Sequence, residues 1–324
     1  METADDKTEN TTLSPDDAFS VLGDETRMRI LQTLGKADEP LSFSELRDRV
    51  DMRDSGRFNY HLKKLEGHFI RKTDDGYGLR QAGNRVIEAV LSGAVTDDPV
   101  VELTRIDQSC PYCGASVEVG FREERVQIFC PNCAGTYRRL DSPQKLDAPA
   151  EYGHIGDILL PPAGIVNRTP DEMTRAAFTW ANLEFAAGAS GVCPRCSARF
   201  EQSVEVCESH DPGDGLCDDC GRRHAVHIRN RCTNCNYGHS GTASLAILDN
   251  IDFQAFLIDH GINPMAPSPE RYFAIESAYE EELLSTDPFK ARFMFSIDGD
   301  TLNLTIDEDL NVVDVSRHDA SGSA

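Results

Sequence analysis

The residues best suited to chemistry in this sequence are potential metal ligands, namely all eleven cysteines and one histidine. Ten of the cysteines form Cys-x-x-Cys pairs, in which two thiolates on one tight turn can bind the same ion: Cys110/Cys113, Cys130/Cys133, Cys193/Cys196, Cys217/Cys220 and Cys232/Cys235. The eleventh, Cys207, has His210 at the same spacing. These side chains supply three complete sets of four ligands. A zinc site with four protein ligands is structural because no position is left for a substrate. The sequence therefore predicts three Zn²⁺ ions and no catalysis at them.

The first set has the spacing of a zinc ribbon. Sixteen residues separate the pair Cys110/Cys113 from the pair Cys130/Cys133. The segment Cys110-Pro-Tyr-Cys113 also equals the dithiol motif of glutaredoxins, but that redox site needs a helix opening at its first cysteine. Gly114 follows directly and a second pair completes a metal site, so we interpret this set as a ribbon.

The remaining seven cysteines and His210 allow two pairings. In the nested pairing, one site inserts into the other; the two ligand sets are Cys193, Cys196, Cys232, Cys235 and Cys207, His210, Cys217, Cys220. In the crossed pairing, Cys193/Cys196 and Cys217/Cys220 share an ion, and Cys207 and a histidine join Cys232/Cys235. We favour the nested pairing because it makes the inserted site compact. It also leaves three histidines without a metal role, as surface or strand residues: His224, His227 and His239.

Composition sets the compartment and limits the partners. The 324 residues contain no apolar run near the ~18 that cross a membrane, and residues 1–12 do not form a signal peptide. We therefore expect a cytoplasmic protein without membrane association, in which paired cysteines bind metal rather than form disulfides. The net charge is −23, with seven lysines and twenty-five arginines. Such acidity opposes nucleic-acid binding unless concentrated salt screens it, and high acidity with few lysines resembles the proteins of salt-accumulating halophiles.

The elements of the N-terminal part can be predicted from caps and apolar spacing. Ser14 precedes a proline and two acids, and Ser42 and Glu45 form a capping box, so both serines begin helices. The turn Asp74-Asp75-Gly76 joins two short strands. The expected elements are helices from Ser14, over 24–34, from Ser42 and over 55–67, strands at 69–72 and 77–80, and a helix over 81–91. This order is that of a winged helix-turn-helix domain, which we place at residues 13–95, after a disordered tail at 1–12.

The fourth helix of this domain is the expected recognition helix. Phe58, Leu62 and Leu65 recur at core spacing. The outer face then carries two cations, a tyrosine and an imidazole, which suit the major groove: Arg57, Tyr60, His61 and Lys64. Residues 41–80 contain nine Lys/Arg and seven Asp/Glu, so the rest of the chain carries all of the net negative charge.

Two segments of this domain resemble the signature stretches of ArsR-type winged-helix transcription regulators. They are Leu22–Leu31 (LGDETRMRIL) and Tyr60–Ile70 (YHLKKLEGHFI), and the resemblance covers about residues 13–93. It implies binding to double-stranded DNA as a homodimer, with the hairpin at 70–80 as the wing. The expected DNA contacts are then Arg53, Arg57, Tyr60, His61, Lys63, Lys64, Arg71, Lys72, Tyr77 and Arg80. The helix at 44–50 lacks the cysteines of arsenic-sensing members, so that type of metal sensing is not supported.

The rest of the chain is expected to be an α+β assembly built around the zinc sites. A zinc ribbon at 100–140 contains two β-like runs, at 116–121 and 125–129, and a proline-rich linker follows at 141–168. A C-terminal domain at 169–316 opens with a helix capped at Thr169, whose apolar face includes Trp180 as a core residue. It continues through a cysteine-rich module at 192–236 and a short helix at 253–259. It ends in an antiparallel β meander of strands at 291–297, 301–306 and 311–315, before a disordered tail at 317–324.

These features indicate a DNA-binding transcription regulator whose C-terminal part dimerises, senses a ligand or recruits a partner. As a whole the chain resembles the large haloarchaeal ArsR-like regulators, which does not identify an effector. The alternative is a zinc-stapled adaptor whose winged helix binds protein. Zinc-binding free energy can hold small modules together, although a ribbon could also contact DNA or a partner, or act as a labile sensor. We find no phosphate-binding loop and no His-Glu-x-x-His motif, so we do not expect an enzyme.

Overall fold

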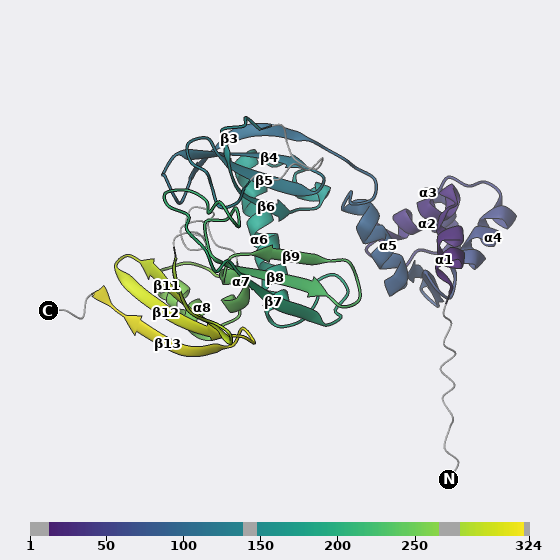
Figure 1. The fold of residues 1–324 in the computed structure, drawn as a ribbon. Helices are drawn as coiled ribbons and strands as arrows, with labels where there is room; N and C mark the ends of the chain where they lie inside the picture. Colours follow the sequence, from purple (N-terminus) through teal and green to yellow (C-terminus); the bar gives the residue numbers. More distant parts are fainter. Residues whose placement is uncertain (1–12, 139–147, 266–278, 321–324) are drawn as a thin grey trace, which may run out of the picture. The chain divides into compact units, whose positions relative to one another are not determined.

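The computed structural model describes residues 13–138, 148–265 and 279–320 (Figure 1). The chain divides into two compact units, Met1–Thr96 and Asp97–Ala324. The tail expected at 1–12 lies outside the described residues, as do 139–140 of the expected ribbon, 141–147 of the expected linker and 321–324 of the expected C-terminal tail.

Over residues 13–96, the first unit consists of five helices and a two-stranded antiparallel hairpin. Their bounds are α1 Pro15–Leu22, α2 Glu25–Gly35, α3 Phe43–Arg49, α4 Ser55–Leu65, β1 Ile70–Thr73, β2 Gly76–Leu79 and α5 Gln81–Leu91. Each of the first four helices begins at a side chain that accepts a hydrogen bond from a main-chain N–H of its first turn: Ser14, Asp24, Ser42 and Asp54. At Ser42 the cap is the reciprocal box with Glu45 that the sequence predicted.

The core of the first unit forms where α2, α3, α4 and the hairpin meet. Its most deeply buried side chains come from every one of these elements: Ile30, Leu31, Leu46, Phe58, Leu62, Leu65 and Ile70. Gly76 at the hairpin turn has φ = +133°, and a Cβ there would collide with the Leu41 carbonyl. A glycine is therefore required for the hairpin to pair with the Leu41 segment.

The second unit contains three antiparallel sheets and a long helix. The sheets have the orders β3-β4-β5-β6, β7-β8-β9 and β10-β11-β12-β13. Their strands are β3 Val101–Ser109, β4 Ser116–Arg122, β5 Arg125–Cys130, β6 Gly153–Leu159, β7 Phe200–Val206, β8 Val226–Cys232, β9 Gly238–Gly241, β10 Glu280–Thr286, β11 Phe289–Ile297, β12 Asp300–Asp307 and β13 Val312–His318. The helices are η1 Pro162–Gly164, α6 Pro170–Ala189, α7 Ser244–Ile247 and α8 Ile251–Asp259.

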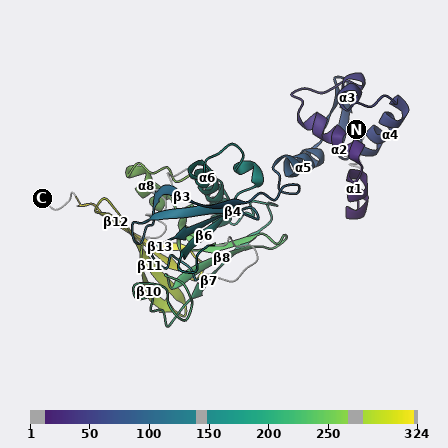
Figure 2. The same ribbon diagram turned by 90° about the horizontal axis from the view of Figure 1, so that it is seen from above.

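Helix α6 connects the cores of this unit (Figures 1 and 2). Met173, Ala177 and Phe178 in its first half pack on the β3–β6 sheet. Phe185 and Ala186 in its second half reach the core shared by β7–β9, α7, α8 and the C-terminal sheet. Trp180 is not the core residue that the sequence predicted, because it is 39 % exposed and Phe178 packs in the core beside Ala177.

Residues 141–168 are not an irregular linker throughout, which corrects the sequence analysis. The segment from Gly153 forms β6, which pairs with β5 and completes the first sheet. A side chain at Gly153 would collide with the carbonyl of Cys133, so the strand needs glycine where it passes the cysteine turn. The prolines on either side of this segment made it look irregular in sequence, yet the residues between them form a strand.

The C-terminal sheet contains the predicted meander and one further strand. Strands β11, β12 and β13 lie at the three expected places, and β10 adds to the edge beside β11. The last strand continues to His318, so the expected disordered tail does not begin at 317. Arg317 is held there by Asp259 of α8 at 2.5 Å. Across the described ranges, the helices are all too short or too polar to cross a membrane.

Candidate metal centres and nucleic-acid interface

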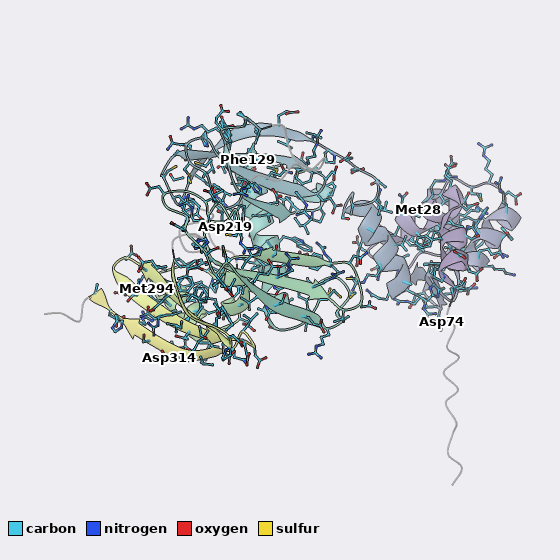
Figure 3. All side chains as sticks on the ribbon, viewed as in Figure 1. Met28, Asp74, Phe129, Asp219, Met294 and Asp314 are labelled. Atoms are coloured by element: carbon cyan, nitrogen blue, oxygen red, sulfur yellow. The ribbon has the colours of Figure 1, made fainter. Side chains whose placement is uncertain are left out.

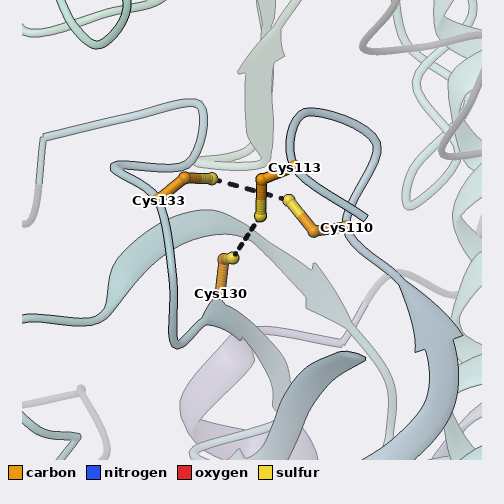
Figure 4. Close-up of side chains that lie close together, drawn as sticks. All are labelled: Cys110, Cys113, Cys130 and Cys133. Atoms are coloured by element: carbon orange, nitrogen blue, oxygen red, sulfur yellow. Dashed lines mark hydrogen bonds between the residues drawn. The ribbon is translucent and has the colours of Figure 1, made fainter. Parts of the chain in front are cut away.

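The first cluster, Cys110, Cys113, Cys130 and Cys133, gathers four thiols from two turns (Figure 4). The sulfur atoms of Cys113 and Cys130 lie 3.4 Å apart, and those of Cys110 and Cys133 lie 3.6 Å apart. Cys110 directly follows β3 and Cys130 ends β5, so the sheet fixes the separation of the two turns. No helix opens at Cys110, because residues 111–113 form a turn, as the ribbon interpretation requires. Burial raises the pKa of the Cys110 thiol, a cost that a bound cation would offset.

The second cluster, Cys193, Cys196, Cys232 and Cys235, joins the end of α6 to the end of β8. Its sulfur atoms lie 3.8 Å apart for Cys193 and Cys235, and 3.4 Å apart for Cys196 and Cys232. The main-chain N–H groups of Asn234 and Cys235 donate to the sulfur of Cys232. The N–H of Cys235 stabilises the thiolate most and, with its neighbours, lowers the pKa of Cys232 to about 6.

The third cluster, Cys207, His210, Cys217 and Cys220, lies between β7 and β8. The sulfur atoms of Cys207 and Cys217 are 4.0 Å apart, and Nδ1 of His210 lies 3.5 Å from the sulfur of Cys220. Nε2 of His210 lies 3.0 Å from the carbonyl oxygen of Arg223, to which it can donate only as N–H. Nδ1 is then the nitrogen that can bind an ion. Main-chain N–H donors, Cys220 first, lower the pKa of Cys217 to about 6.

Each cluster fits one tetrahedral metal ion. All ligand atoms of a cluster lie within 4.8 Å of one another. Four sulfurs about 2.3 Å from one zinc ion would lie about 3.8 Å apart, close to the spacing observed. The structure brings together the nested ligand sets and not the crossed ones. It also shows His224 and His227 buried rather than at the surface, and His227 and His239 in strands β8 and β9.

Two arginines connect the first cluster to the third, through links that the sequence did not predict. Nε of Arg223 donates to the Gly135 carbonyl at 2.9 Å, two residues after Cys133. Arg138 donates to the carbonyls of Cys217 and Asp218 in the third cluster. These hydrogen bonds span 79 to 88 residues of sequence, so no local spacing could have indicated them.

The candidate nucleic-acid interface is the exposed face of α4 and the β1–β2 hairpin in the first unit. Eight of the ten expected contacts are exposed there or at the adjoining ends: Arg53, Arg57, Tyr60, Lys63, Lys64, Arg71, Lys72 and Arg80. Lys64 lies over the Tyr60 ring, with Nζ 5.8 Å from its centroid. Helix α4 has no acidic residue in its first turn and two lysines in its last.

His61 and Tyr77 do not belong to this interface, which corrects the sequence analysis. His61 is 4 % exposed because it lies on the same stripe as Phe58 and Leu65, and its Nδ1 is 3.4 Å from the Asp24 carboxylate. Tyr77 is 6 % exposed because its strand pairs with Leu41 and its ring packs into the core. The i, i+3, i+4 spacing predicted that His61 lies on the exposed face of α4, but this position lies at the edge of the buried face.

Comparison with family models gives two matches. A model described as a domain of unknown function, DUF7347, matches residues 15–90, which covers most of the first unit. A second, described as a domain of unknown function, DUF7351, matches residues 107–312, which include all three clusters. No curated protein and no solved structure matches the chain. Since the second match spans more than half of the sequence, the chain belongs to the DUF7351 family.

Proposed function

We propose that the chain is a transcription regulator that binds duplex DNA through its first unit. In this proposal the unit is a winged helix-turn-helix of the ArsR type, with α4 as the recognition helix and the β1–β2 hairpin as the wing. The observation that carries the proposal is the gathering of exposed cations on these two elements. In a chain of net charge −23, this local concentration of cations favours an anionic partner such as the DNA backbone.

The chemistry of the α4 surface supports a role in the major groove. Arg57 and Lys64 are both exposed, seven residues apart, and so lie on one face of the helix. Arginine can bind guanine with two hydrogen bonds, and lysine can bind phosphate or guanine. Phe58 and Leu62 hold the opposite face in the core, which fixes the direction of the cationic side chains.

The proposal includes Zn²⁺ at the three clusters. Zinc suits sites of four cysteines or of three cysteines and one histidine, and its binding supplies folding free energy of about 10 kcal/mol or more per site in small peptides. With four protein ligands each, the ions would hold turns together rather than bind a substrate. Their place is in the second unit, which would act as the regulatory or partner-binding part.

We further propose that the first unit forms a homodimer through α1 and α5. Helix α1 has no buried residue, and its Phe19 is 73 % exposed. Leu91 at the end of α5 is 51 % exposed. Large apolar side chains on the two terminal helices of one unit are expected to be covered by a second copy.

The test is fluorescence-polarisation binding of the zinc-loaded protein to genomic duplex fragments, including its own promoter, in molar KCl. We expect selective binding, and the Arg57→Ala/Lys64→Ala variant should lose it while its zinc content stays unchanged. The residual affinity of the variant should also depend less on salt. Two phosphate-binding cations are missing, so the slope of log affinity against log salt should be less steep by about 2.

A matched control removes the same charge elsewhere in the unit. Arg29→Ala/Lys36→Ala changes two solvent-accessible cations outside α4, the hairpin and the proposed dimer helices, and it should retain selective binding. Equal losses from both double variants would show attraction by charge alone. An absence of duplex binding at every salt concentration, from folded zinc-loaded protein, would instead favour the adaptor and direct attention to protein partners.

A further inference from the structure

The second unit contains a cavity that has no part in metal binding. It has a volume of about 110 Å³ and lies where α6, β5, β6, β9 and α7 meet. Figure 1 shows these elements in the middle of the unit. Residues of two hydrophobic cores line the cavity. Phe178 belongs to the core on the β3–β6 sheet, and Leu245 belongs to the core around β8 and α7.

The lining has an apolar wall and one charged group. Ile128, Phe178, Phe185 and Leu245 provide apolar surface. Asp157 is the charged residue of this lining, and its side chain is 25 % exposed, so solvent reaches it. It accepts a hydrogen bond from His154 at 2.8 Å when Nε2 carries a proton. An ionised carboxylate has about four acceptor sites, so it can bind a further donor as well.

Gly156 gives the cavity its opening on the β6 side. A Cβ built on this residue meets no atom within 4 Å, and the residue is not in the left-handed region. Its pairing partner across the sheet is Ile128, which also lines the cavity. The backbone conformation at position 156 does not require glycine. The open space here therefore results from the missing side chain.

One wall of the cavity is the segment that connects two of the metal clusters. Thr136 and Tyr137 line the cavity, directly between Gly135 and Arg138, which bond to the third-cluster region. The N–H groups of Thr136 and Tyr137 both donate to the carbonyl of His154 in β6. A molecule in the cavity would thus contact the segment that determines how the first and third clusters are held.

We propose that this cavity binds a small organic cation with an aliphatic body. The apolar wall would take the aliphatic part, and Asp157 would accept hydrogen bonds from the cationic head group. A cavity of about 150 Å³ binds benzene, so this one suits about five non-hydrogen atoms. The net charge of −23 favours a cation over an anion of the same shape. This binding does not depend on the proposed DNA binding.

The test uses three probes with the same branched body: isobutylamine, isobutanol and isobutyrate. They are titrated into full-length, zinc-loaded protein labelled at isoleucine methyl groups, without DNA and in molar KCl. We expect isobutylamine to give saturable shifts of Ile128, Ile155 and Ile158, which line the cavity, with isobutanol weaker and isobutyrate without effect.

Two variants probe the two parts of the site. Gly156→Val fills the cavity with a residue suited to a strand, and it should abolish binding of both isobutylamine and isobutanol. Asp157→Asn should weaken isobutylamine binding at least about tenfold and change isobutanol binding by less than about twofold. Asp314→Asn, which removes an exposed acid from β13 (Figure 3), should change neither.

Several results would overturn the proposal. They are binding of isobutyrate as tight as that of isobutylamine, shifts confined to other methyl groups, or no saturable shift with any probe. Unchanged isobutylamine affinity in Asp157→Asn would also contradict the proposal. This variant tests the proposal even if Gly156→Val fails to retain three metal ions. Because no duplex is present, failure here leaves the proposed regulator untouched, and success does not presuppose it.

Discussion

The guanidinium group of Arg223 lies over the ring of Tyr112, with Cζ 4.0 Å from the ring centroid. Tyr112 stands between Cys110 and Cys113 in the first cluster. The main-chain carbonyl of Arg223 faces Nε2 of His210 in the third cluster. A single residue therefore holds the turn of one cluster with its side chain and orients a ligand of another with its main chain.

The first prediction is that Arg223→Ala weakens metal binding in both of these clusters. The substitution removes a cation–π contact and the hydrogen bond to Gly135, together worth about 2 kcal/mol. These contacts also anchor the main chain of residue 223, whose carbonyl faces His210, so their loss should loosen a ligand of the third cluster as well. We expect two of three zinc ions to be released about tenfold faster to a chelator, measured with a colorimetric zinc indicator. The second cluster makes no contact with Arg223 in the described part of the chain and should release its ion at the original rate.

The control for this prediction is Arg231→Ala, an exposed arginine in β8. It should leave all three release rates unchanged. If Arg223→Ala accelerates release of the first-cluster ion alone, the two clusters are adjacent without being coupled.

The second prediction distinguishes the two ligand pairings by counting ions. Cys193 and Cys232 belong to one cluster in the structure, so the double variant Cys193→Ser/Cys232→Ser should lose one zinc ion by native mass spectrometry. The double variant Cys193→Ser/Cys217→Ser should lose two, because these residues belong to different clusters. The crossed pairing requires the reverse, with two ions lost from the first variant and one from the second.

The sequence was most informative where the determining contacts are local. Ligand spacing led to the grouping of the cysteines, and side-chain caps such as Ser42 and Thr169 located the starts of helices. A tight cysteine turn or a helix cap involves residues two or three positions apart, so its signal survives without knowledge of the fold.

Features decided by distant packing could not be predicted in this way. Strand β6 needs Gly153 because the Cys133 turn packs against it, and that contact is visible only in the folded chain. Trp180 and Phe178 are both apolar residues of α6, and the placement of two sheets decides which one is buried. The role of Arg223 likewise depends on contacts made across more than eighty residues.

The third prediction concerns the buried carboxylate of Glu184 on α6. It accepts a hydrogen bond from the Tyr237 hydroxyl at 2.6 Å and pairs with Arg195 at 2.9 Å. Burial raises the pKa of Glu184, so these donors are needed to keep a charge at this site. Tyr237→Phe retains the stacking on Phe200 and removes only the hydroxyl. We expect a loss of about 1 to 3 kcal/mol in the free energy of unfolding, measured by urea denaturation.

A suitable comparison is Tyr152→Phe, which removes a hydroxyl that donates to the less buried Glu118 at 3.2 Å. Its effect should be smaller, because water can replace the lost donor there. Equal effects of the two substitutions would mean that burial of Glu184 does not make its hydrogen bond costly to lose.

The fourth prediction is a loss of stability in mild acid that originates at His239. Burial among Phe185, Phe200 and Tyr237 lowers the pKa of His239 to about 4, against about 6.5 in an unfolded chain. Above pH 6.5 the imidazole is neutral in both states, so its contribution to stability is complete. As the pH falls from 6.5 toward 4, the unfolded chain takes up a proton that the folded chain excludes, and stability is lost.

His239→Gln should reduce this pH dependence, because glutamine does not titrate and its carbonyl can accept from Asn230 as the imidazole does. Between pH 7.5 and pH 5.5 we expect the variant to lose about 1 kcal/mol less stability than the original protein, in urea denaturation at saturating zinc. Zinc release in acid affects both proteins alike, so it cancels in this difference. His318→Gln, at an exposed position of β13, should follow the original protein. Parallel pH curves for His239→Gln and the original protein would show that His239 can become charged in the folded state without cost.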